Sequence, residues 1–174
     1  WSNGNMYIPD YTHLPLEEQV EAARIRLRME PLFEAFQHKG DLEARNGFPG
    51  ILRDPLADFE KIRDEDTLTC GDEPGSTGIN GTGCISRYDF YRNVLKLGMS
   101  EHKRLGVNPY KVGAVGGTDT HNGTPGLTEE WIFSGHVGSA DATPDGRLGS
   151  GTVTHNFRVY NPGGLTAVWS VENS

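Results

Sequence analysis

The sequence of 174 residues lacks any long apolar run and is short of basic residues. No stretch approaches the roughly 18 consecutive apolar residues of a transmembrane helix, which excludes a membrane span in this segment. Only 16 Lys and Arg stand against 24 Asp and Glu, and the formal net charge is −8. Because a nucleic-acid backbone binds to a basic face, we expect no nucleic-acid partner. A small anionic ligand remains compatible with this charge.

Cysteine is scarce as well, with only Cys70 and Cys84, which bracket a glycine-rich stretch. Their spacing is not that of a zinc-binding Cys-x-x-Cys pair. Two alternatives stay open. A disulfide would close a short loop, contribute about 3 kcal/mol and indicate a periplasmic or secreted protein. Two reduced thiols would suit the bacterial cytoplasm. In either case we expect residues 64–85 to form a Gly-rich surface loop.

An initiator methionine is also missing, since the sequence begins at Trp1 and stops at Ser174. We therefore expect a segment of a longer protein, truncated at both ends. The length suits a single domain, which we take to be incomplete, over residues 1–174.

Two helices are predicted from apolar periodicity. LEEQVEAARIRLRM, Leu16–Met29, places apolar residues at helical spacing and stops before Pro31. A second helix is expected over residues 86–105, with a capping box that begins at Ser86 and a stop at Gly106.

Strands are predicted where short apolar runs lie between turn residues. Residues 32–38 alternate in character, whereas 110–117 and 165–171 are continuous runs typical of strands buried on both faces. This order of helices and strands predicts an α/β chain. Shorter elements are expected at 55–63 for a helix, and at 131–133 and 152–159 for strands.

The stretch GGTDTHNGTPG follows the second predicted strand and carries the main candidate site. In an extended chain, Asp119 and His121 point the same way and can converge on one ion. A carboxylate oxygen and an imidazole nitrogen suit Zn, Mn or Fe, and Asn122 could orient a ligand from behind. The alternative is an ordinary turn capped by an Asp side chain.

Further candidate ligands lie on the strand predicted at 32–38. Glu34 and His38 project from one face of an otherwise apolar strand, and such a local conflict is typical of functional positions. The alternative is an edge strand with one solvated face.

The remaining polar candidates have no support from spacing. His13, His136 and His155 are each better explained as non-ligands. Arg45 and Arg53 could hold the anionic group of a substrate by paired hydrogen bonds, although each also suits an ordinary surface position.

The motifs also resemble a known family. DTHNGTPG, with LGVNPYKVGAVGGTDTHN overlapping it and NPGGLTAVWSVEN after it, resembles a large uncharacterised bacterial family, a domain of unknown function. SNGNMY, EAFQHKGDLEARNG and CISRYDFYRNVL match in the same order, so the resemblance covers nearly the whole segment. That family in turn is similar to the polymerase-and-histidinol-phosphatase (PHP) metal-dependent hydrolases, among the amidohydrolase-like barrels.

The resemblance implies part of a distorted α/β barrel whose strand ends hold two or three metal ions. Asp119 and His121 match the late Asp-x-His motif, and Glu34 or His38 would supply a ligand from a preceding strand. The opening His-x-His motif has no counterpart here and would lie upstream of Trp1, so this segment would hold a partial site.

The implied activity is metal-dependent hydrolysis of a phosphoester or a related bond, with a small-molecule substrate. A non-catalytic ligand-binding or structural module on a barrel scaffold is the alternative. A barrel segment leaves strand edges unpaired, so we also expect the isolated chain to be marginally stable.

Overall fold

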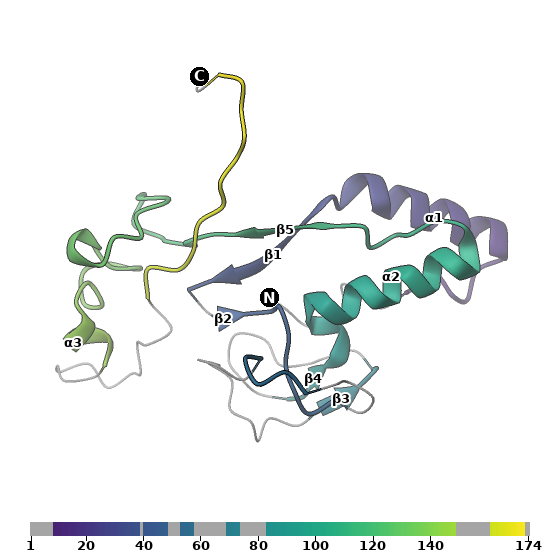
Figure 1. Ribbon diagram of the computed structural model, residues 1–174, viewed down its shortest axis with the longest axis horizontal. Helices are drawn as coiled ribbons and strands as arrows, with labels where there is room; N and C mark the ends of the chain where they lie inside the picture. The colour runs from purple at the N-terminus through teal and green to yellow at the C-terminus, as the bar shows by residue number, and fades with distance from the viewer. Residues whose placement is uncertain are drawn as a thin grey trace. The chain divides into compact units, whose positions relative to one another are not determined.

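The computed structural model describes residues 9–38, 40–48, 53–57, 69–73, 83–148 and 161–172 (Figure 1). The chain divides into two compact units. The first comprises Trp1–Ala35 and Asp41–Ala114, and the second comprises Phe36–Gly40 and Val115–Ser174. Compact units of one chain need not be separate domains, so the single domain over 1–174 stays a prediction. No helix among the described residues is long and apolar enough to cross a membrane.

Helix α1 of the first unit spans Leu16–Met29, as the sequence predicts. Pro15 precedes its first turn, where Glu17 and Glu18 favour the positive end of the helix dipole. On its inner face Ala23 is buried in a small hydrophobic cluster. The amphipathic pattern therefore fixes both the extent of this helix and the side that it buries.

The second predicted helix is divided into two pieces. A 3-10 turn, η1, spans Arg87–Asp89, and helix α2 spans Tyr91–Leu105. Ser86 and the last residue of η1 form the expected capping box, and Gly106 ends α2 in the left-handed conformation. The helix is interrupted at Phe90, whose backbone is extended and whose buried ring packs into a cluster of its own.

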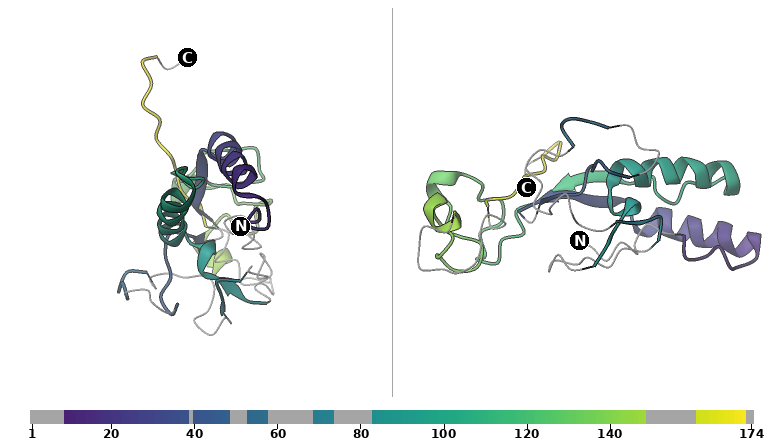
Figure 2. Two further views of the ribbon diagram at one scale, coloured as in Figure 1. Left: turned by 90° about the vertical axis from the view of Figure 1, so that its right-hand side faces the viewer. Right: turned by 90° about the horizontal axis from the view of Figure 1, so that it is seen from below.

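Helices α1 and α2 lie side by side and run in opposite directions (Figures 1 and 2). The Tyr11 hydroxyl donates to Glu101 Oε2 at 3.0 Å, and Arg104 Nη1 donates to Gln19 Oε1 at 2.5 Å. Burial and the hydrogen bond to Glu101 raise the pKa of Tyr11, which keeps the hydroxyl protonated as a donor. Polar contacts therefore fasten the two helices at one end.

Three short strands form one sheet. β1 spans Leu32–Gln37, β2 spans Gly40–Asp41 and β5 spans Gly113–Gly116, in the order β2-β1-β5. β1 and β5 point the same way in Figure 1, with α2 between them in sequence, which is the connection of a βαβ unit. The main hydrophobic core consists of Phe33, Leu42, Val94, Tyr110 and Val112.

The expectation that residues 110–117 form a strand buried on both faces is wrong. The strand is only Gly113–Gly116, and its residues are exposed or half-buried. Among the described residues, β5 is an edge strand of the sheet. The buried side chains Tyr110 and Val112 precede the strand and pack from irregular backbone.

The two cysteines are paired. β3, Thr69–Gly71, and β4, Ile85–Ser86, lie parallel, and a disulfide joins Cys70 to Cys84 with a Cα–Cα distance of 5.3 Å. Of the two alternatives in the sequence, the disulfide is the one observed. A disulfide is compatible with an extracellular location.

The prediction of a buried strand at 165–171 is wrong. The structure has no strand there, Val168 is exposed and the Trp169 side chain is 100% exposed. Among the described residues no other strand pairs with this segment. It is attached through Thr166, whose hydroxyl donates to the Gly116 carbonyl oxygen and accepts from the Gly116 amide.

The second unit holds two further short elements, η2 at Glu130–Ile132 and α3 at Pro144–Arg147. A strand was predicted at 131–133, and a 3-10 turn is found instead. Three other predicted elements lie partly or wholly outside the described residues: 58–63 of the helix, 64–68 and 74–82 of the loop, and the whole strand at 152–159. The described part of the chain forms no closed barrel, and the distorted barrel stays a prediction.

Candidate functional site

The backbone turns at Asp119, which has a φ of 48°. This left-handed conformation costs a residue with a side chain about 1–2 kcal/mol, although Asp tolerates it better than most. The prediction that Asp119 and His121 lie on one extended segment is therefore wrong. Strained backbone of this kind is concentrated at functional sites.

His121 folds back on the same turn. Its Nδ1 lies 2.9 Å from the main-chain oxygen of Asp119. Because a carbonyl oxygen only accepts, Nδ1 carries the hydrogen, and a neutral ring has its lone pair on Nε2. A hydrogen bond from one ring nitrogen to a backbone carbonyl is the usual way in which a metal-binding histidine is oriented. The exposed ring of His121 is thus arranged as an Nε2 ligand or a proton acceptor.

The carboxylate of Asp119 contacts a second histidine. Its Oδ2 lies 3.3 Å from Nε2 of His38, whose side chain is fully buried in the turn after β1. An ionised carboxylate can only accept, so Nε2 of His38 donates in this contact. The main-chain oxygen of His38 accepts from Asn161 Nδ2 at 3.0 Å, which fixes the turn.

His136 completes the cluster, although sequence spacing gave it no support. Its ring centroid lies 3.7 Å from that of His38 and 4.4 Å from that of His121, and the residue is 2% exposed. The amide of His121 also donates to the main-chain oxygen of His136 at 2.9 Å. The one available signal was its setting between two glycines nearby, which resembles the glycine-flanked stretch around His121.

Asn122 holds the loop that carries His136. Its Nδ2 lies 2.7 Å from the Gly135 oxygen, 2.9 Å from the Gly138 oxygen and 3.3 Å from the Ser134 oxygen. Its Oδ1 accepts from the Gly138 amide at 2.8 Å. In the structure the Asn122 side chain ties two loops together, and its predicted role in orienting a ligand stays a prediction.

A buried carboxylate supports the same loop. Asp141 Oδ2 accepts from the His136 amide at 2.7 Å, and the main-chain oxygen of Asp141 accepts from Arg147 Nη1 at 2.8 Å. Arg147 also pairs with Glu130 and lies over the ring of Phe133. Sequence reasoning missed Asp141, which acts on the histidine backbone and not on its ring.

The segment after residue 160 packs closely on the approach to Asp119. The amide of Gly164 donates to the Gly117 oxygen at 2.8 Å. Gly163 has a φ of 77°, and a Cβ there would lie 2.8 Å from Thr118 Cα. The glycine pair in NPGG is therefore required by this close contact.

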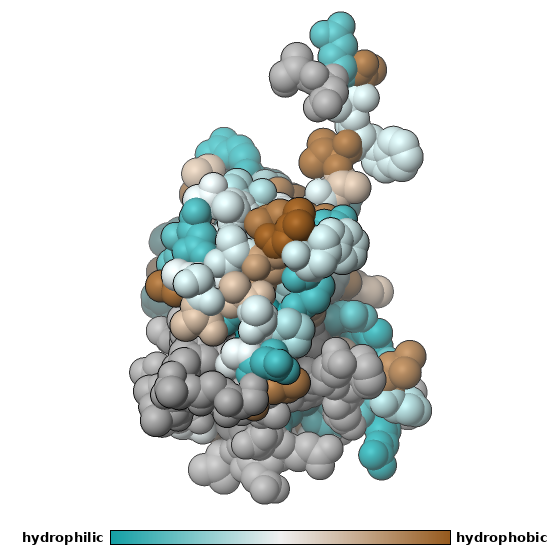
Figure 3. All heavy atoms as spheres, turned by 90° about the vertical axis from the view of Figure 1, so that its left-hand side faces the viewer, coloured by the Kyte–Doolittle hydropathy of each residue, from teal (hydrophilic) through white to brown (hydrophobic). Residues whose placement is uncertain are grey.

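The face seen in Figure 3 mixes hydrophilic and near-neutral residues with hydrophobic ones. The exposed hydrophobic residues of the second unit include Trp131, Ile132, Val137 and Leu148.

Other predicted site residues lie elsewhere in the chain. Glu34 is half-buried in β1 and, like Arg45, belongs to the first unit. Arg45 and Arg53 line a cavity of about 510 Å³ in that unit. His13 is exposed before α1. His155 lies outside the described residues.

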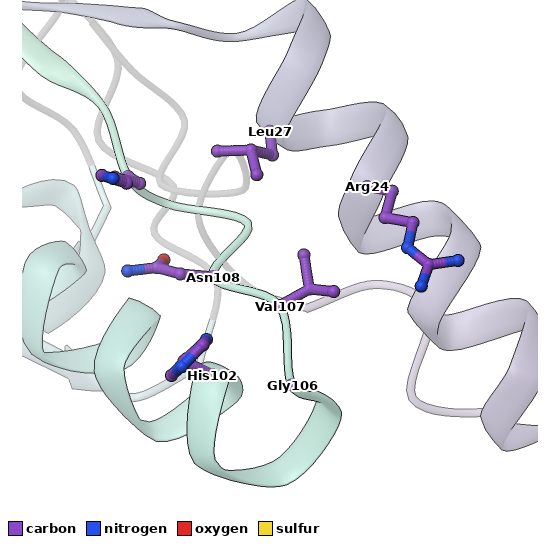
Figure 4. A pocket seen from close by; sticks show the side chains of 7 residues that line it. Arg24, Leu27, His102, Gly106, Val107 and Asn108 are labelled. Carbon is purple, nitrogen blue, oxygen red and sulfur yellow. The ribbon is translucent and has the colours of Figure 1, made fainter.

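A second cavity of the first unit, of about 550 Å³, lies between α1 and the end of α2 (Figure 4). Leu27 extends from α1 and Val107 from the loop after α2 into this space. Its polar lining consists of Arg24, His102, Asn108 and Lys111. It contains none of the predicted metal ligands.

The donor set of the cluster suits a divalent metal in kind, since imidazole and carboxylate ligands are typical of Zn, Mn and Fe. The spacing of the imidazole rings, however, does not match that of two ligands on one ion. Two imidazoles on one tetrahedral ion, with bonds of about 2.1 Å, have ring centroids roughly 5 Å apart. The rings of His38 and His136 lie closer than this. Within the described residues no group of three or more His, Cys, Asp or Glu is placed to hold a metal ion.

These features define a chain of helices and short strands with a histidine–aspartate cluster in its second unit. The chain belongs to the family described as "Protein of unknown function (DUF3604)", whose model matches residues 1–174. No curated protein matches the sequence. No solved structure matches it either. The family membership expected from the motifs is confirmed, and the similarity to PHP enzymes stays a prediction.

Proposed function

We propose that the chain carries part of the active site of a metal-dependent hydrolase of PHP-like type, which acts on a phosphoester or a related bond. One observation carries the proposal: Asp119, His38, His121 and His136 meet in a closed series of contacts within one unit. The resemblance of DTHNGTPG to the late metal motif of PHP enzymes supports the same reading.

Each residue of the cluster has a distinct part in this proposal. His121 offers Nε2, since its Nδ1 hydrogen is held by the Asp119 carbonyl oxygen. The Asp119 carboxylate and the ring of His136 are the further donors, and His38 orients that carboxylate through its Nε2. Asn122 fixes the loop of His136. A divalent metal bound by such donors lowers the pKa of a coordinated water toward neutrality and polarises the scissile group.

The close contact between the tilted rings of His38 and His136 sets a structural condition for the proposal. For His38 to act as a ligand in addition to orienting Asp119, its ring and that of His136 have to separate by about 1 Å, because tetrahedral bonds to one ion require a wider spacing. His136 sits on a loop held by Asn122 and Asp141 through its backbone, which leaves its side-chain torsions to provide that adjustment. Glu34 belongs to the first unit, and its part as a ligand stays a prediction.

The disulfide bears on the compartment, and the resemblance to PHP enzymes bears on the substrate. The Cys70–Cys84 disulfide supports export to the periplasm or beyond. The substrate we propose is a small molecule with an anionic group.

Metal content tests this proposal. The full-length protein is dialysed against Mn²⁺, Zn²⁺ or Fe²⁺, and bound metal and p-nitrophenyl phosphate hydrolysis are measured for Asp119→Ala, His121→Ala and His136→Ala. We expect each variant to lose bound metal and hydrolysis together. His13→Ala, which removes an exposed histidine of the first unit, is the matched control and should retain both.

A non-catalytic module is the alternative, and the buried ring contact of His38 with His136 favours it. In that case the wild-type protein carries no stoichiometric metal after any of the three dialyses, and the hydrolase proposal is abandoned. If all three variants retained metal, the metal would bind elsewhere, and this cluster would be excluded as the metal site.

A further inference from the structure

The cavity of about 510 Å³ in the first unit is lined mostly by polar and cationic side chains. Its volume is within the range of small-molecule sites, which is about 300–1,000 Å³. All of its lining residues belong to the first unit, so it is distinct from the histidine cluster. The cationic residues of the lining are Arg45, Arg53, Arg92 and Lys96, and Asp54 is its one acidic residue.

The single carboxylate of the lining is already occupied. Arg92 Nη1 donates to Asp54 Oδ2 at 2.6 Å, and Arg92 also pairs with Glu43. The hydrogen bond from Arg92 lowers the pKa of Asp54, which keeps it ionised and paired. Among the described residues, neither Arg53 nor Lys96 has an ion-pair partner. Cationic charge therefore collects here in a chain whose net charge is −8.

The walls that carry these cations are fixed by backbone contacts. Asn46 Nδ2 donates to the main-chain oxygen of Asp54 at 2.7 Å, and Asn46 Oδ1 accepts from the main-chain amide of Asp54 at 2.9 Å. These two bonds hold the segment of Arg53 against the chain before it. On the other wall, Arg92 and Lys96 are four residues apart on α2 and so share one face of the helix.

We propose that this cavity binds the oxyanion group of a small molecule, of the phosphate type, through Arg53 and Lys96. Arg45, which is 8% exposed, forms the inner wall beside Asn93. An arginine fork and a lysine ammonium are the side chains that bind phosphate oxygens through charge-assisted hydrogen bonds. The site does not depend on the hydrolase proposal, because none of its residues belongs to the histidine cluster.

Inorganic phosphate is the probe for this site. Its binding to the full-length protein is measured by calorimetry in the presence of a chelator, so that phosphate held by a metal does not contribute. We expect saturable binding, weakened about tenfold or more in Arg53→Gln/Lys96→Gln, since this variant removes both charge-assisted hydrogen-bond donors. Weaker binding of acetate than of sulfate would confirm a preference for tetrahedral anions.

The matched control is Arg24→Gln/Lys111→Gln, which removes the same charge from the lining of the second cavity. It should leave phosphate affinity within twofold of wild type, and so should Asp119→Ala. If phosphate affinity fell equally in both double variants, the effect would be due to net charge alone, and the proposal would be overturned. Absence of saturable phosphate binding, or a loss confined to the control variant, would overturn it as well.

Discussion

Asn122 is the side chain whose removal should loosen the candidate site most selectively. Its Nδ2 has two hydrogens and three carbonyl oxygens within reach, so at most two strong bonds form there, to Gly135 and Gly138. The bond accepted from the Gly138 amide is a third. At about 1 kcal/mol each, and with water replacing part of the loss at a half-exposed position, Asn122→Ala should destabilise the loop by about 2 kcal/mol.

Amide hydrogen exchange is the assay, because the change is local. A cost of about 2 kcal/mol raises the opening equilibrium roughly thirtyfold. The reporter is the amide of His136, which donates to Asp141 and not to Asn122. The amide of Gly106, which donates to the His102 oxygen in the first unit, is the internal control and should not change.

The isosteric variant Asn122→Asp distinguishes the loss of the hydrogen bonds that Nδ2 donates from the loss of side-chain volume. A carboxylate keeps the acceptor for the Gly138 amide but cannot donate to the two carbonyl oxygens, so its His136 amide should exchange at least tenfold faster than wild type. Wild-type protection in Asn122→Asp would show that the donor bonds contribute nothing. The reasoning about the clamp would then be refuted.

Three further variants test other parts of the structure by urea unfolding. Cys70→Ser/Cys84→Ser should lose about 3 kcal/mol, as expected for a disulfide that closes a loop of this length; equal stability of the variant and the oxidised wild type would contradict this. Gly163→Ala should lose about 2 kcal/mol or more, because its φ is positive and its Cβ would clash with Thr118; an unchanged midpoint would be inconsistent with the observed contact. Ser86→Ala should lose about 1 kcal/mol with the capping box, and a stabilised variant would count against the cap.

Local signals in the sequence predict much of the first unit. The bounds of α1 follow from Pro15, the apolar spacing and Pro31, and the end of α2 follows from Gly106. These are short-range effects of sterics and backbone hydrogen bonding. The prediction of a continuous second helix is wrong at Phe90. The backbone is extended there, and the ring is buried in a cluster with Phe48 and Ile85. Such a contact is not visible from spacing.

The site was predicted in part and for a partly wrong reason. Asp119, His121 and His38 do come together, but through a left-handed turn and not through an extended segment. His136 was set aside because ring contacts between distant loops leave no periodic trace. The strand expected at 165–171 failed for the opposite reason, since its apolar run has no partner strand among the described residues.

The physical character of the cluster argues for a purpose other than stability. Buried imidazoles such as His38 and His136 bring less apolar burial than Phe or Leu would, and they need polar partners. Asp119 adds an unfavourable backbone conformation. Unfavourable local conformations persist where surrounding contacts hold them in place. Asn122 and Asp141 hold the loop of His136 in this way. A cluster that costs stability, exposes one oriented imidazole and is held by polar contacts supports the proposed metal site, in which His121 would meet the ligand.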